Sequence, residues 1–567
     1  MTDNPNYLDE LQNWSWSAIE PEYAALASRP INADSVEDWL ADWSALAARV
    51  ADWQVRLYIA TTINTADSAA QARFQRFLDE VFPSFRAAEQ QLKEKLLASN
   101  QEPPGFAVPL RNMRAEAELY REANVPLLAE IQTLNTRFDQ ISGAQSVKWD
   151  GQERTLSRLK PVYQEPDRER RERAWRLAAE RQLADRDAIN SQWREYLGLR
   201  RKLAVNAGYG DDYRAYRWHE MLRFDYTPDD CLRFHDAIEA VVVPAAARVY
   251  ERRRRRLGLP QLRPWDLDVD TAGRPPLRPF DSVDQLAGHT STMFHALDAQ
   301  LGAYFDIMRG EGLLDLDNRP NKAGGAYCEY LYASRRPFIF MNAVGVHDDV
   351  FTLLHEAGHA FHSFEFLALP YFQQWQVVSE FSEVASIGME LLASSHLEAS
   401  RGGFYSAADA ARARADNLEG LLLFWPYMAV VDAFQHWAYT YPGEADHPAN
   451  CDAEWAAQWK RFMVGIDWSG LEAECVTGWQ RKLHIHQYPF YYVDYGLAQL
   501  GAVQVWRNAL ADQPGALAAY RRALALGGTL PLPQLYVAAG ARLAFDAVTL
   551  REAVELIETN LSQLELE

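Results

Sequence analysis

Cysteine is scarce in this sequence, with four such residues among 567. None of them forms a C-x-x-C pair, and they stand at Cys231, Cys328, Cys451 and Cys475. A disulfide framework is therefore not expected. We expect reduced and mostly buried thiols, as in a cytoplasmic protein.

Positive charge is also in deficit. Lys and Arg together number 57 and Asp and Glu 78, which gives a net charge of −21 at pH 7. Nucleic acids and many membrane surfaces are themselves negatively charged, so neither is an expected partner. We interpret the acidity as a feature that favours solubility.

Long hydrophobic runs are missing as well. The most apolar stretch, residues 421–431, contains Pro426 and is shorter than the ~20 residues that span a bilayer. We predict a core helix there and no association with a membrane. Residues 1–5 show neither a basic nor an apolar region of an export signal, so we expect a cytoplasmic location.

Aromatic residues, by contrast, are abundant, with 18 Trp, 26 Tyr and 25 Phe. They can supply a large core, and the length favours more than one domain. Helical periodicity dominates, and an Asp-Gly turn predicts a small β-hairpin at residues 146–155. We predict a mainly α protein with a small β-sheet, composed of an N-terminal helical domain (1–200) and a second domain (201–567) that carries the chemistry.

The most informative motif is H-E-x-x-H at residues 355–359. Apolar residues recur at helical spacing around it, so we predict a helix with Asp348 or Asp349 at its N-cap. The i, i+4 spacing places His355 and His359 on one face, where both imidazoles can bind one Zn²⁺. Glu356 lies beside the metal and can take a proton from a zinc-bound water. The motif predicts a zinc peptidase with one Zn²⁺ per chain.

A catalytic zinc site uses a third protein ligand and keeps one position for water. The predicted helix at residues 377–390 follows the motif and carries Glu380, Glu383 and Glu390, so we place the metal site within residues 350–390. In enzymes of the thermolysin type the third ligand follows the second histidine by about twenty residues, which points nearer to Glu380. Spacing alone does not choose between Glu380 and Glu383.

Residues 338–362, together with Glu383-Val384-Ala385-Ser386, resemble the oligoendopeptidase F family of thimet-type zinc metallopeptidases. The resemblance implies that Glu383 is the third ligand and that Glu380 and Glu390 are structural or orient the ligands. It implies the same supporting or substrate-side position for His362, which matches the H-E-x-G-H-x-x-H pattern of the family. It further implies a multi-helical zincin-type fold with a deep substrate channel that admits short peptides.

Two other segments resemble the same family, and the first precedes the motif. Residues 324–328 and 337–342 predict two strands just before the metal-binding helix. An edge strand with small residues can hydrogen-bond the backbone of an extended peptide, which makes Gly325, Ala326 and Tyr327 candidate substrate-binding residues. An ordinary strand with a glycine turn explains the glycines equally well.

The second segment is aromatic and covers residues 484–496. Peptide hydrolysis passes through a tetrahedral oxyanion, and one donor directed at it accelerates the reaction ~10²–10³-fold. The spacing leaves His484 or His486 as the histidine and Tyr491, Tyr492 or Tyr495 as the phenol donor. The local pattern, by resemblance, favours His484, Tyr492 and Tyr495 for the oxyanion and leaves His486 and Tyr491 as substrate contacts.

These features predict a zinc-dependent oligoendopeptidase that cleaves internal bonds of short peptides. Glu356 would pass the proton taken from water to the leaving amine. The alternative is a C-terminal-acting carboxypeptidase or dipeptidyl carboxypeptidase, in which Arg481 or Lys482 would bind the free carboxylate of the substrate. A catalytically silent peptide-binding protein is disfavoured because Glu356 is intact.

Overall fold

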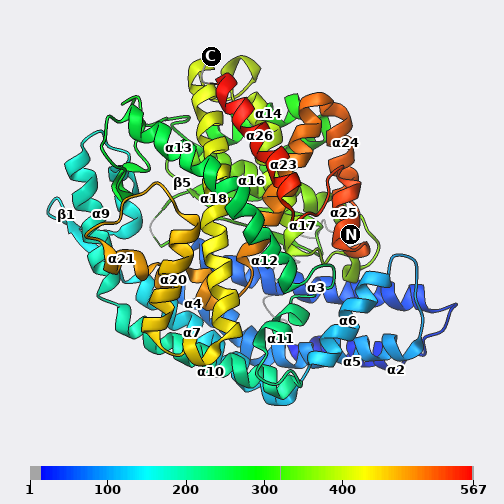
Figure 1. Ribbon diagram of the computed structural model, residues 1–567. Helices are drawn as coiled ribbons and strands as arrows, with labels where there is room; N and C mark the ends of the chain where they lie inside the picture. Colours follow the sequence, from blue (N-terminus) through cyan, green and yellow to red (C-terminus); the bar gives the residue numbers. More distant parts are fainter. Residues whose placement is uncertain (1–14, 320, 565–567) are drawn as a thin grey trace. The chain divides into compact units, whose positions relative to one another are not determined.

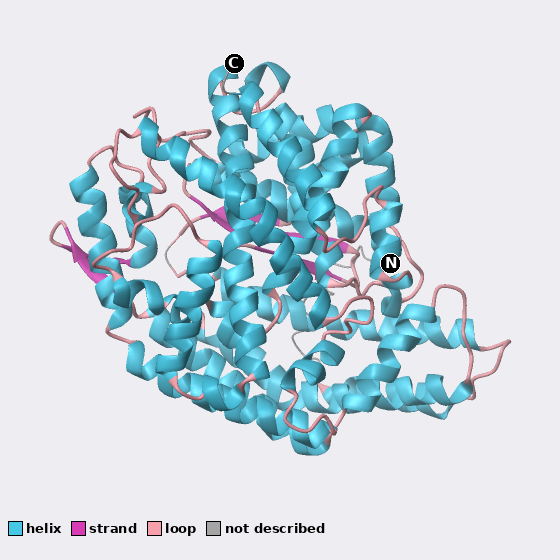
Figure 2. Cartoon of the chain, viewed as in Figure 1, coloured by secondary structure: helices cyan, strands magenta, loops and turns pink. Residues whose placement is uncertain are grey.

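A computed structural model describes residues 15–319 and 321–564 of the chain (Figure 1). Helices make up most of it, and the strands are few and short (Figure 2). The mainly α fold with a small sheet is thus confirmed. Contacts within the chain divide it into two compact units, of which the first comprises residues 1–118, 278–410 and 501–543 and the second residues 119–277, 411–500 and 544–567.

This division differs from the single boundary expected at residue 200. Helix α3 (Val36–Ile63) packs against strand β4 (Tyr327–Leu331), which lies far from it in sequence. The hydroxyls of Thr62 and Tyr327 lie 2.6 Å apart in a hydrogen bond. The N-terminal helices therefore belong to the same unit as the H-E-x-x-H segment, because packing and not sequence proximity defines a unit.

The first unit contains helices from all three of its segments. They are α2 (Trp16–Ser28), α3, α4 (Ser68–Arg76), the π-helix η1 (Phe77–Val81), α5 (Phe82–Ser99), α6 (Ala107–Leu119), α14 (Val283–Leu297), α15 (Ala299–Gly310), α16 (His347–Phe366), α17 (Ser379–Ala393), α24 (Gln513–Leu524) and α25 (Leu532–Ala538). A three-stranded sheet of β3 (Leu314–Asp317), β4 and β5 (Arg336–Ala343) completes it.

The sheet has the strand order β3-β5-β4, with β3 parallel and β4 antiparallel to β5. The antiparallel register pairs Tyr327 with Phe340 and Leu331 with Arg336. Strands β4 and β5 also pack against α16. The two strands predicted just before the metal-binding helix are therefore present, and β4 is an edge strand of this sheet.

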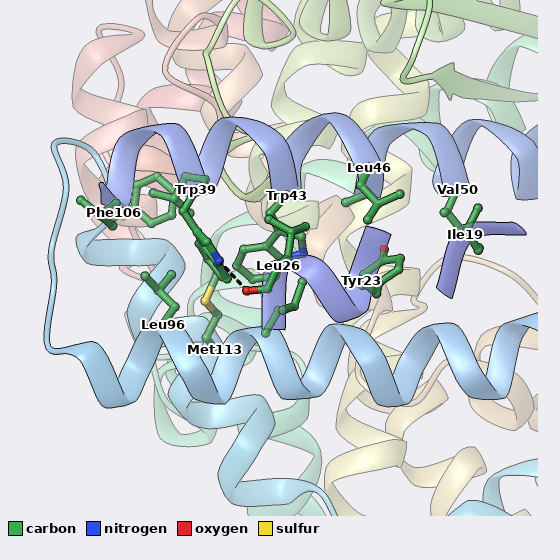
Figure 3. Close-up of a cluster of buried hydrophobic side chains, with 14 of the residues drawn as sticks. Ile19, Tyr23, Leu26, Trp39, Trp43, Leu46, Val50, Leu96, Phe106 and Met113 are labelled. Atoms are coloured by element: carbon green, nitrogen blue, oxygen red, sulfur yellow. Dashed lines mark hydrogen bonds between the residues drawn. The ribbon is translucent and has the colours of Figure 1, made fainter. Parts of the chain in front are cut away.

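A core of buried aromatic and aliphatic side chains joins α3 to its helical neighbours (Figure 3). Trp39, Trp43, Leu46 and Val50 follow the 3.6-residue repeat and so share one face of α3. They pack against side chains of α2, α5 and α6, among them Ile19, Tyr23, Leu26, Leu96 and Met113. The indole Nε1–H of Trp39 donates to the carbonyl oxygen of Leu26 at 3.0 Å, so its one polar group is satisfied inside the core.

The second unit is helical apart from one β-hairpin. Its helices are α7 (Val125–Gly143), α8 (Lys160–Tyr163), α9 (Arg168–Leu183), α10 (Arg186–Ala207), α11 (Tyr213–Glu220), α12 (Pro228–Ala237), the π-helix η4 (Ile238–Val242), α13 (Val243–Arg256), α19 (Pro442–Ala445), α20 (Pro448–Phe462), α21 (Glu472–Val476), α22 (Leu483–Gln487) and α26 (Ala547–Leu564). Helices α18 (Ala407–Thr440) and α23 (Tyr492–Ala511) begin in one unit and end in the other.

The predicted hairpin is formed by β1 (Ser146–Trp149) and β2 (Gln152–Thr155). Asp150 and Gly151 both have positive φ, 48° and 82°, as a type I′ turn requires at its two central positions. The apolar stretch at residues 421–431 lies inside α18, as predicted. None of the described helices combines the length and apolarity needed to cross a membrane.

All four cysteines are free thiols in the structure. Cys231 and Cys451 are buried, whereas Cys328 and Cys475 are half-buried. The burial expected of the thiols is therefore complete at two of the four positions and partial at the other two.

Replacing Trp39 with Ala should lower the free energy of unfolding by ~3–5 kcal/mol, because the change opens a cavity in the core and removes a buried hydrogen bond. Urea unfolding followed by circular dichroism measures the effect. Glu37→Ala on the exposed face of the same helix is the control and should change it by less than ~0.5 kcal/mol. Equal stability of the two variants would contradict the core assignment.

Candidate active site

Helix α16 carries the H-E-x-x-H motif, and Asp349 fixes its beginning. One carboxylate oxygen of Asp349 accepts hydrogen bonds from the backbone N–H groups of Val344, Gly345 and Val346, at 2.8, 2.9 and 2.9 Å. The sequence predicted Asp348 or Asp349 at the N-cap. The N-cap residue is Val346, and Asp349 lies in the first turn of the helix. These bonds fix the backbone turn that leads into the helix.

Helices α16 and α17, both labelled in Figure 1, pack against each other. They approach closely at Gly358, inside the motif. A Cβ at this position would lie 2.6 Å from the carbonyl oxygen of Ala385 and 2.6 Å from Cα of Ser386, both in the backbone of α17. Only glycine fits such an approach. The Tyr520 hydroxyl of α24 donates to the same Ala385 oxygen at 2.6 Å.

The close packing brings three predicted ligands together. Oε2 of Glu383 lies 3.4 Å from Nε2 of His355 and 3.7 Å from Nε2 of His359. The three ligand atoms lie within 4.8 Å of one another. Two atoms bound to one tetrahedral Zn²⁺ are ~3.4 Å apart, since each metal–ligand bond is ~2.1 Å long. The donor set therefore fits a zinc ion, and Glu380 is not part of it.

Hydrogen bonds hold the predicted ligand side chains in place. Glu390, predicted to orient a ligand, lies with Oε1 2.7 Å from Nδ1 of His355. The carboxylate requires a proton on Nδ1 and so leaves Nε2 for a metal. Ser386 donates to Oε2 of Glu383 at 2.9 Å, and the hydroxyl of Ser382 lies 3.3 Å from Nδ1 of His359. Neither serine was predicted from the sequence. Their positions were a usable signal, because Ser386 lies one helical turn after Glu383 and Ser382 directly precedes it.

Carboxylates and burial shift the pKa values of the motif residues. Burial alone would lower the pKa of His355, but the hydrogen bond to Glu390 and the nearby carboxylates raise it to about 9. Burial lowers the pKa of His359 to about 4. Glu356 is 7% exposed, and burial is the main cause that raises its pKa to about 7. The negative charges of Glu383 and Glu390 also raise this pKa, whereas His355 lowers it. A carboxyl group with this pKa exchanges protons readily near neutral pH.

His362 does not support the ligands as predicted. Its side chain is fully buried, and neither ring nitrogen has a hydrogen-bond partner. The ring packs edge-on against Phe366 and Phe381, with centroids 5.3 and 5.9 Å away. Burial lowers its pKa to about 3, so the ring is neutral. His362 is a core residue because its position on α16 turns it toward Phe381 of α17.

The candidate substrate-binding residues of the strand segment lie at the start of β4. Gly325 is exposed and has a φ of +92°, and Ala326 and Tyr327 are half-buried. The ring of Tyr327 stacks on Phe340 at 4.6 Å between centroids. Asn342 donates to the carbonyl oxygen of Gly325 at 3.0 Å, which fixes the turn that leads into the edge strand.

The aromatic segment lies in the second unit, and His484 stands at the centre of its side chains. The His484 ring is 4.9 Å from Tyr492, 6.0 Å from Tyr495 and 6.1 Å from Tyr491, measured between centroids. His484, Tyr491 and Tyr495 are half-buried and Tyr492 is buried. The structure thus gathers the four aromatic residues predicted from the sequence.

His486 lies elsewhere, in the core of the second unit. It has no exposed surface, and its ring stacks on Phe138 at 4.6 Å and approaches Trp193 and Trp479. Its backbone carbonyl accepts a hydrogen bond from Arg200. A side chain so enclosed cannot touch a substrate, so the position of His486 contradicts its prediction as a substrate contact and favours His484.

Lys482 contacts the aromatic group directly. Its Nζ donates to the Tyr492 hydroxyl at 2.9 Å and lies 4.0 Å from the centre of the Tyr492 ring. Burial lowers the pKa of Lys482 to about 8, and burial raises the pKa of Tyr492 well above its usual range. The neighbouring Arg481 donates to Oε1 of Gln182 and to the carbonyl oxygen of Glu474, at 3.3 and 3.2 Å. Both cations therefore bind groups of the protein itself.

Two residues outside the segment hold its backbone, and neither was predicted from the sequence. Arg223 donates to the carbonyl oxygen of Phe490 at 2.7 Å and pairs with Asp494. The side chain of Gln435 accepts from the N–H of Phe490 at 3.2 Å and donates to the carbonyl oxygen of His484 at 3.3 Å. Phe490 has a φ of +64°, uncommon for a bulky side chain, and these bonds stabilise the bend.

Comparison with known proteins agrees with this architecture. Among solved structures, Pz peptidase A with an inhibitor is 26% identical over 98% of this chain and 97% of that one, with a TM-score of 0.87. A protein provisionally named oligoendopeptidase F is also 26% identical, with 97% of both chains covered and a TM-score of 0.87. Oligoendopeptidase-F from Enterococcus faecium shares the fold at 15% identity, 98% coverage of both chains and a TM-score of 0.61.

Family models match most of the sequence. The model of the peptidase M3 N-terminal domain matches residues 10–103, and that of peptidase family M3 matches residues 162–555. No curated protein matches the sequence. Because the family match covers more than half of the chain and includes the H-E-x-x-H helix, this protein belongs to peptidase family M3 and is a metallopeptidase of the oligoendopeptidase F type.

Proposed function

We propose that this metallopeptidase is a zinc-dependent oligoendopeptidase that hydrolyses internal bonds of short peptides. The observation that carries the proposal is the spacing of His355, His359 and Glu383, whose ligand atoms fit one ion. Zn²⁺, when bound to them, lowers the pKa of water to about 7 and polarises the scissile carbonyl. The side chains of the protein perform the remaining steps.

Glu356 is the proton carrier in this proposal. It takes a proton from the attacking water and later passes it to the amine of the leaving peptide. Its pKa of about 7 supports both roles, because such a carboxyl group accepts and releases a proton near neutral pH at little cost. Glu390 supports the reaction from behind His355 by accepting from Nδ1–H, which leaves Nε2 as the nitrogen that would bind the metal.

His484, Tyr492 and Tyr495 are the donors that we propose for the oxyanion. Because the Tyr492 hydroxyl oxygen accepts a bond from Lys482, its own hydrogen remains to donate. Its raised pKa keeps the phenol neutral, as a donor to a developing negative charge must be. Tyr491 adds to the aromatic surface beside them, where we propose that it contacts the substrate.

The edge position of β4 supports recognition of a peptide backbone. An extended peptide can add to such an edge through main-chain hydrogen bonds, which read no particular side chain. Gly325, Ala326 and Tyr327 would form the start of this surface. The deep channel that admits only short peptides stays a prediction from the family.

The alternative, cleavage from a free C-terminus, needs a cation that can bind the terminal carboxylate. The two candidates, Arg481 and Lys482, bind Gln182, the Glu474 carbonyl and Tyr492. These contacts favour endopeptidase activity.

A short peptide blocked at both ends should be cut at internal bonds, and a chelator should abolish the cleavage. Glu356→Gln should retain its metal but lose turnover ~10²–10⁴-fold, because the amide cannot carry the proton. Mass spectrometry of the products and metal analysis measure the two effects. Glu365→Gln on the same helix is the matched control and should keep its rate. Trimming of unblocked peptides alone would instead establish a C-terminal-acting enzyme.

The choice of third ligand is tested by two glutamates one turn apart. Glu383→Gln should lose most of its bound metal, because a neutral amide is a poor zinc ligand. Glu380→Gln should keep one equivalent at this site, since Glu380 lies outside the donor set. Metal analysis after dialysis gives the comparison, and the reverse result would make Glu380 the ligand.

Glu390 is expected to tune the affinity for metal without binding it. Glu390→Ala removes the acceptor behind His355 and should weaken zinc binding ~10–100-fold. Glu390→Gln, whose amide oxygen still accepts from Nδ1–H, should lose less. Competition with a chromogenic chelator reports both affinities. An unchanged affinity in the Ala variant would show that the hydrogen bond does not orient the ring.

A further inference from the structure

A second group of metal-ligand side chains lies in the second unit, apart from the H-E-x-x-H motif in sequence. Sγ of Cys231, a carboxylate oxygen of Asp432 and a ring nitrogen of His436 lie within 4.8 Å of one another. The three residues are 0%, 0% and 2% exposed. Their donor atoms therefore share a small volume that solvent does not reach.

Two helices supply these donors with the same i, i+4 spacing. Cys231 and His235 lie one turn apart on α12, and Asp432 and His436 lie one turn apart on α18. Nε2 of His235 is 2.8 Å and Nε2 of His436 is 3.3 Å from Oδ2 of Asp432. The spacing places the two side chains of each helix on one face, so that the two faces meet at the Asp432 carboxylate.

Several polar atoms of this cluster lack hydrogen-bond partners. Nδ1 of His436 has none, and the same holds for Nδ1 of His235 and Oδ1 of Asp432. Among the residues that the structure describes, no Lys or Arg pairs with the Asp432 carboxylate. Buried polar groups in proteins are almost always satisfied, so this set calls for a further binding partner.

A divalent cation meets that demand. One thiolate and one carboxylate neutralise its two charges, which removes the electrostatic cost of burying them separately. The combination of sulfur, imidazole nitrogen and carboxylate oxygen suits Zn²⁺ or a similar transition metal and not Mg²⁺ or Ca²⁺, which favour oxygen ligands alone.

We propose that Cys231, Asp432 and His436 bind a second transition-metal ion, with Zn²⁺ as the natural occupant. His235 holds the Asp432 carboxylate in place through its hydrogen bond. On binding, the Cys231 thiol loses its proton to solvent as the metal–sulfur bond forms. This proposal concerns a site other than the catalytic one and does not depend on which peptides the enzyme cleaves.

The location of the cluster indicates a structural role. An enclosed site without a position open to substrate is typical of structural zinc. The ion would fasten α12 to α18, and α12 continues into η4, which packs against α26. The ring of His436 also lies 5.1 Å from Phe490, at the bend of the aromatic segment. The site therefore supports the segment that carries His484 and Tyr492.

Substitution with Co²⁺ separates this site from the catalytic one, because only this site has a sulfur ligand. The full-length protein reconstituted with Co²⁺ should show a thiolate-to-Co²⁺ charge-transfer band in the near ultraviolet. His359→Ala, which disables the catalytic ligand set, should keep the band and one metal equivalent of two. A folded His359→Ala protein with no metal and no band would overturn the proposal.

The sulfur is identified by two cysteine variants. Cys231→Ala should lose the band and one equivalent, whereas Cys451→Ala should keep both. Cys451 is an equally buried thiol, with its S–H donated to the carbonyl oxygen of Ala445. A band that persists in Cys231→Ala would refute the assignment. If Cys231→Ala does not fold, the spectrum and metal content of His359→Ala still decide.

Discussion

The close contact between α16 and α17 is the constraint on which the catalytic half of the structure depends. At Gly358 the two backbones approach so nearly that even a methyl group would collide with Ala385. This distance lets the short carboxylate of Glu383 reach the two histidines of the motif. A larger residue would force the helices apart and separate the ligands, so the glycine in the motif has a geometric role besides the chemistry of its neighbours.

Around this contact, burial and negative charge act together. Glu383 and Glu390 flank His355, and burial strengthens their influence because little water screens them. The same surroundings raise the pKa of Glu356 to about 7. A cation at the site would neutralise part of this charge. This grouping of carboxylates favours the binding of a divalent cation.

The aromatic segment shows a second way of positioning side chains, here those of the proposed oxyanion donors. Its tyrosines and His484 lie near a bend at Phe490 that its own sequence disfavours. Arg223 and Gln435 bind the backbone there, and His436 packs against the Phe490 ring. The geometry of the segment is therefore maintained by α18 and by the chain before α12. The proposed second metal would strengthen the same support.

The sequence by itself determined the elements with a strong local pattern. The i, i+4 histidines on an amphipathic helix, the Asp-Gly hairpin and the core helix at residues 421–431 all follow from spacing and turn chemistry within a few residues. Tertiary structure decided what depends on distant contacts. The place of Glu383 among the donors, the burial of His362 and His486, the serines behind the ligands and the meeting of Cys231 with Asp432 and His436 belong to this group. Such outcomes depend on which helices pack together, and a short window of sequence carries no information about a neighbour two hundred residues away.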